Sequence, residues 1–67
     1  MKEQIQSLIE QGKIKEAIEL GIESNEQCIL LKARHNNLEK SFYLGLITLN
    51  GFKRDEAVIL NALIDLL

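Results

Sequence analysis

A regular spacing of apolar residues between positions 28 and 45 constrains the fold of this chain more than any other feature of its sequence. These residues recur at alternating intervals of three and four, which places them on one face of an α-helix: Cys28, Leu31, His35, Leu38, Phe42 and Gly45. Polar residues follow the same rhythm on what we expect to be the opposite side: Lys32, Asn36, Glu39 and Tyr43. We therefore predict a long amphipathic helix over residues 25–44, with a polar ridge facing away from the core.

Local stop and start signals divide the rest of the chain into three more helices. Gly12 and Gly45 follow apolar periodic runs, and a glycine there can adopt the left-handed conformation that closes a helix. This predicts helices over about residues 2–11, 13–23 and 49–66. The short connections between them favour antiparallel hairpins.

Capping residues predict where two of these helices begin. Ser24 and Gln27 have the spacing of a capping box, so we expect the long helix to start at Asn25. Thr48 is the expected N-cap of the last helix. Gly51 costs about 1 kcal/mol relative to alanine inside a helix, which predicts a frayed or displaced first turn there.

We predict an all-α fold, namely a compact four-helix bundle made of two antiparallel helix hairpins. At 67 residues the chain is one domain, and we expect 1–67 to be a single helical interaction domain. Its last residues lie within an apolar run that has no stop signal, which indicates a domain excised from a longer multidomain protein. The predicted core consists of Ile5, Leu8, Ile18, Leu31, Leu38, Phe42, Phe52, Ile59 and Leu63.

Charge and hydropathy argue against two classes of partner. The net charge is −2, so the chain lacks the basic surface that binds nucleic acid or an anionic membrane. No apolar run approaches the ~18 residues of a membrane span. A single cysteine excludes an internal disulfide and fits a reducing compartment, so we expect a cytoplasmic protein.

The titratable residues do not form a catalytic or metal-binding pattern. Cys28 and His35 share a helix face, but seven residues of helix separate them by ~10 Å, too far for a nucleophile and its base. We interpret Cys28 as a small buried hydrophobe and His35 as a neutral residue of the core or its boundary. The run Lys53–Glu56 is interpreted as a solvated helix face. We predict no enzyme, cofactor or metal.

Arg34 has two interpretations, which the residue pattern weighs equally. It borders the apolar stripe of the long helix, so it could bridge within the bundle to Asp55 or Glu56, or bind a carboxylate on a partner. Asn36 and Glu39 are expected to point outward on the polar ridge, where a solvated role is the simplest explanation.

The sequence also resembles a known family, and its motif extends over nearly the whole chain. The run LLKARHNNLEKSFYLGLIT and the ending NALIDLL are similar to the type-eleven effector-associated domains of bacterial conflict systems. The matching positions are Leu31, Ala33, Arg34, Asn36, Leu38, Glu39, Leu44, Gly45, Leu46, Ile47, Thr48, Ala62, Leu63 and Asp65. The chain departs from the family pattern at three positions: His35, Gly51 and Ala57.

The resemblance implies a non-catalytic adaptor that associates with a like or paired domain and so joins effector and sensor proteins in a bacterial defence or signalling system, such as antiviral defence. Because packing or capping explains most matched positions, the candidate partner-binding residues are Arg34, Asn36, Glu39, Lys32 and Tyr43. The expected partner is another copy of this domain type, giving a homo-oligomer or a hetero-association. The alternative is a generic oligomerisation module or helical-repeat fragment, which would use the remaining apolar residues Leu20, Leu60, Ile64 and Leu67.

Overall fold

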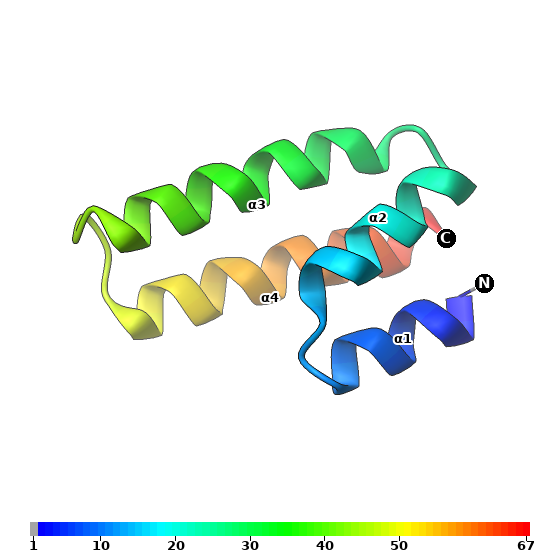
Figure 1. The fold of residues 1–67 in the computed structure, drawn as a ribbon, viewed down its shortest axis with the longest axis horizontal. Helices are drawn as coiled ribbons and strands as arrows, with labels where there is room; N and C mark the ends of the chain where they lie inside the picture. Colours follow the sequence, from blue (N-terminus) through cyan, green and yellow to red (C-terminus); the bar gives the residue numbers. More distant parts are fainter. Residues whose placement is uncertain (1) are drawn as a thin grey trace.

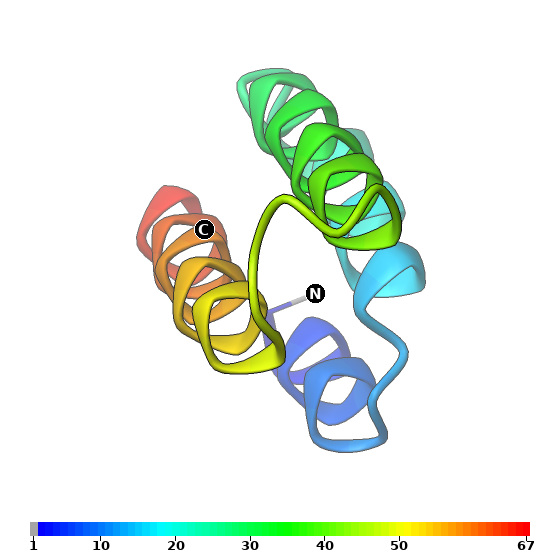
Figure 2. The ribbon, with the colours of Figure 1, turned by 90° about the vertical axis from the view of Figure 1, so that its left-hand side faces the viewer.

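The computed structural model describes residues 2–67 and confirms the all-α bundle. This range contains four helices: α1 (Lys2–Glu10), α2 (Ile14–Ser24), α3 (Cys28–Tyr43) and α4 (Leu49–Leu66). α3 packs against α2 and α4, and α1 packs against the same two helices, so the four surround one core (Figure 1). Viewed along its length, the bundle has the helices arranged around a common centre (Figure 2).

Both predicted glycine stops are confirmed, and each closes its helix with the same pair of backbone hydrogen bonds. Gly12 and Gly45 have φ angles of 78° and 76°, a left-handed conformation that side-chain-bearing residues rarely adopt. After α1, Lys13 N donates to Leu8 O at 2.9 Å and Gly12 N donates to Ile9 O at 3.0 Å. Leu46 and Gly45 repeat this pattern after α3. Two otherwise unsatisfied carbonyls are thereby bonded at each helix end.

The predicted capping box between α2 and α3 is wrong. Ser24 belongs to the last turn of α2, and α3 begins at Cys28, three residues later than expected. Asn25 fills the junction instead, because its Oδ1 accepts from Gln27 N at 3.0 Å and its Nδ2 donates to Leu66 O at 3.1 Å. The second bond ties the junction to the end of α4, a contact that local sequence does not reveal.

At the start of α4, Thr48 is the N-cap as predicted, but Gly51 does not displace the first turn. Thr48 is extended, with φ −79° and ψ 164°, and its side-chain oxygen accepts from Gly51 N at 3.1 Å. The helix begins directly at Leu49. The expected displacement of this turn is wrong, since Gly51 supplies the backbone N–H that the cap satisfies.

Most of the predicted core is buried, with some exchange at its edges. Ile5, Ile18, Leu31, Leu38, Ile59 and Leu63 are buried as expected. Leu8, Phe42 and Phe52 are half-buried, and the core gains Ala17, Cys28 and His35. Ala17 and Gly21 allow α2 to approach closely, so that a Cβ added to Gly21 would lie 2.6 Å from Leu63 Cδ1.

Unequal helix lengths leave one end of the bundle uncovered. α1 and α2 have 9 and 11 residues, whereas α3 and α4 have 16 and 18. The α3–α4 hairpin consequently extends beyond the shorter hairpin (Figure 1). Large apolar side chains are exposed at this end: Tyr43, Leu44, Leu46 and Leu49.

Candidate interaction surface

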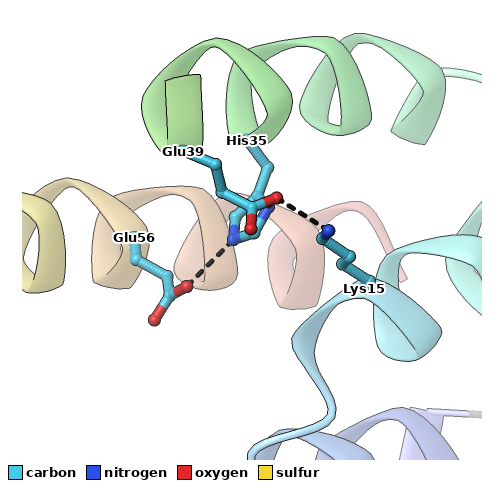
Figure 3. A network of polar contacts seen from close by, with 4 residues as sticks. All are labelled: Lys15, His35, Glu39 and Glu56. Carbon is cyan, nitrogen blue, oxygen red and sulfur yellow. Dashed lines mark hydrogen bonds and ion pairs between the residues drawn. The ribbon is translucent and has the colours of Figure 1, made fainter. Parts of the chain in front are cut away.

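A polar cluster joins three helices at the edge of the core. Figure 3 shows Lys15 of α2, His35 and Glu39 of α3, and Glu56 of α4 meeting around the imidazole ring. His35 Nε2 lies 2.9 Å from Glu56 Oε2, and His35 Nδ1 lies 3.4 Å from Glu39 Oε1. Lys15 Nζ is 3.2 Å from the same Glu39 oxygen. The cluster therefore links α3 to both of its neighbours.

The surroundings of His35 explain why a polar residue can occupy the apolar stripe. The residue is 3% exposed, and each ring nitrogen faces a carboxylate oxygen, which accepts but does not donate hydrogen bonds. A ring that donates from Nε2 satisfies Glu56. The ring additionally contacts Phe52 edge-on, with centroids 6.4 Å apart. This confirms a core histidine, and the carboxylate partners are the part that the sequence did not indicate.

The predicted polar ridge lies on the flank of α3 that faces α2, rather than opposite the core. The Glu39 side chain is 16% exposed because it contacts Lys15 and His35, so the prediction that it points outward is wrong. Lys32 forms an ion pair with Glu19 of α2. Asn36 and Tyr43 are exposed, and Tyr43 reaches 77%. Two of the five candidate residues thus have partners within the bundle.

Arg34 lies on the other flank of α3, next to α4. Within residues 2–67 it forms no ion pair, so neither bridge considered from the sequence is present in the structure. Instead, Arg34 and Asp55 line a surface hollow of about 420 Å³ between α3 and α4. Glu56, the other possible partner, binds His35. The run Lys53–Glu56 is therefore exposed at its first three residues and half-buried at the fourth.

The side of α3 that faces solvent is partly apolar. Ile29 is 53% exposed and Leu30 is 68% exposed, and both lie in the first turn of α3, before His35. Val58 on α4 is 52% exposed beside the Arg34 hollow. These three residues are absent from the predicted contact surface, although their positions off the core stripe are a signal that could have identified them.

The apolar residues assigned to the alternative function are less available. Leu20, Leu60 and Leu67 pack against the core, and Ile64 is half-buried. Their partial burial leaves less apolar area for an oligomerisation contact than Leu30 and Val58 offer.

Cys28 is a buried thiol, as expected from the sequence. Its side chain is fully buried beside Gly21, and burial raises the pKa of the thiol above its ordinary value of 9.0. The thiol is therefore a weaker nucleophile at neutral pH than an exposed cysteine. Among the residues that the structure describes, no group of three or more His, Cys, Asp or Glu side chains could hold a metal ion.

Comparison with known proteins decides the family. A family model for effector-associated domain 11 matches residues 1–67, the whole chain. The chain belongs to the effector-associated domain 11 family. No curated protein and no solved structure gives a significant match to this effector-associated domain. Over residues 2–67, none of its helices combines the length and apolar character needed to cross a membrane.

Proposed function

We propose that this effector-associated domain is a non-catalytic cytoplasmic adaptor, which brings an effector protein and a sensor protein together in bacterial antiviral defence. It does so by binding another copy of itself or a paired domain of the same type. Membership of the family supports the link to effectors. The free thiol of Cys28 is in keeping with a reducing compartment.

The observation that carries this proposal is the solvent-facing side of α3. Its bundle neighbours cover one side of the helix, and the other side presents Leu30 to solvent. Arg34 is exposed on the flank next to α4, and Asn36 is exposed on the flank next to α2. Exposed apolar side chains beside charged ones are typical of a protein contact surface, where apolar burial provides affinity and charges select the partner. Arg34, Asn36 and Tyr43 remain the exposed candidate residues that form no ion pair in the described part of the chain. Lys32 and Glu39 have a supporting role, since they hold α3 against α2.

Self-association of the purified domain tests the proposal. Sedimentation velocity and light scattering over a wide concentration range should show reversible association that weakens as salt is raised, because exposed charges are screened within about 10 Å at 0.1 M salt. An association that is insensitive to salt would favour the generic apolar oligomerisation module. A domain that stays monomeric at all concentrations, and that also fails to bind paired domains from its own genomic neighbourhood, would contradict the adaptor function.

A further inference from the structure

The hollow between α3 and α4 carries opposite charges on its two walls. Arg34 and Asn37 stand on the α3 wall, and Asp55 and Val58 stand on the α4 wall. The floor is apolar and consists of buried core residues, Leu38 and Ile59. A surface with an apolar centre and charged edges has the composition of a protein contact site.

Neither charge is neutralised by the bundle itself. In the described part of the chain, Arg34 and Asp55 form no ion pair with each other or with another residue, and both are exposed. Apolar area adjoins them, since Val58 is 52% exposed and Leu30, one helical turn before Arg34, is 68% exposed. Removing such area from water is favourable by about 25 cal/mol per Å². The site therefore offers both apolar surface and unused charge to a partner.

The charge arrangement is complementary to itself. In a two-fold symmetric contact, a residue of one copy meets a second residue of the other copy, and the reverse pair forms automatically. A two-fold axis along the hollow places the α3 wall of one copy over the α4 wall of the other. Arg34 of each copy then faces Asp55 of the other, which gives two equivalent pairs, one on each side of the axis.

We propose that the occupant of this hollow is a second copy of the same domain, held by two reciprocal Arg34–Asp55 ion pairs that flank the apolar floor of Leu38 and Ile59 and the exposed side chain of Val58. This inference rests on the proposed function and specifies its contact surface. A partner with a single sign of charge fits less well, because it would be repelled by either Arg34 or Asp55. Asn36, on the α2-facing flank, and Tyr43, at the end of α3, do not line the hollow and lie outside this contact.

Charge reversal separates this arrangement from other modes of association. In Arg34→Asp both charged positions of each copy become acidic, and in Asp55→Arg both become basic, so each variant alone repels itself at both pairs. We expect each single variant to weaken dimerisation roughly tenfold or more. An equimolar mixture of the two should associate again, and the double variant R34D/D55R should self-associate like the wild type. Lys40→Asp is the matched control, because Lys40 is an exposed lysine of α3 outside the hollow.

The readout is the dimer dissociation constant from sedimentation equilibrium, with circular dichroism to establish that each variant is folded. Rescue in the mixture supports the reciprocal pairs, since a general loss of stability would not be repaired by mixing. A wild type that dimerises together with single variants that dimerise equally well would overturn this inference and leave the adaptor function standing. A wild type that does not associate would instead contradict the homotypic mode of the proposed function.

Discussion

Replacing Gly21 by alanine tests whether the close approach of α2 to α4 sets the packing of the core. A Cβ at this position would lie 2.6 Å from Leu63 Cδ1 and 3.3 Å from Cys28 Sγ. Carbon atoms in contact normally lie about 3.5–4.0 Å apart, so roughly 1 Å of overlap must be relieved. Leu63 is fully buried and has little free space into which it can turn.

Two effects of opposite sign determine how much Gly21→Ala changes the free energy of unfolding. Alanine is favoured over glycine inside a helix by about 1 kcal/mol, whereas overpacking a well-filled core costs about 1–3 kcal/mol. We expect Gly21→Ala to lower the free energy of unfolding by about 1 kcal/mol. For a domain of this size, that change lowers Tm by roughly 4–8 °C.

Gly51→Ala is the matched control, because a Cβ there would lie 3.4 Å from Thr48 Oγ1, an ordinary contact. It should leave stability unchanged or raise it by up to about 1 kcal/mol. The assay is urea unfolding followed by circular dichroism. Leu63→Val withdraws the terminal methyl groups and should reduce the cost of Gly21→Ala in the double variant. Equal stability of Gly21→Ala and Gly51→Ala would refute the packing argument.

Three further predictions concern the cap, the thiol and the polar cluster. Thr48→Ala should lower the free energy of unfolding by about 1 kcal/mol in urea titrations, and Thr48→Ser should restore most of it. Burial raises the pKa of the Cys28 thiol, so the folded state keeps the thiol proton above pH 9, where the unfolded state loses it. The free energy of unfolding should therefore fall as pH rises beyond 9, and it should fall more in the wild type than in Cys28→Ala. His35→Leu removes the hydrogen bond to Glu56 and should destabilise the domain by about 1–2 kcal/mol. In a double-mutant cycle with Glu56→Leu, the coupling energy should be about 1 kcal/mol. Strictly additive losses would show that the hydrogen bond contributes nothing to stability.

Signals that are local in sequence predicted much of the fold. The glycine stops and the Thr48 cap depend on a few neighbouring residues, and the structure contains all three. The junction at Asn25 was missed because Ser24 and Asn25 are both good capping residues. Asn25 bonds both to the nearby Gln27 N and to Leu66 O, which lies 41 residues away and which no local pattern reveals.

The candidate surface was harder to predict, because the periodicity of α3 describes that helix alone. It separates core positions from the others, but it does not say which flank a neighbouring helix covers. Glu39 was placed on the outer ridge, although Lys15 of α2 and the His35 ring both contact it. The sequence left Arg34 undecided between a bridge within the bundle and a partner contact, because its relation to the α4 wall depends on the register of the α3–α4 hairpin.

The order of the helices places the beginning of α1 and the finish of α4 at one pole of the molecule, and the turn over residues 44–48 at the opposite pole (Figure 1). A polypeptide tethered to either end therefore departs from the same pole. Cargo, labels or surface attachments introduced there would leave the leucines of the far turn, Leu44 and Leu46, accessible to probes in solution.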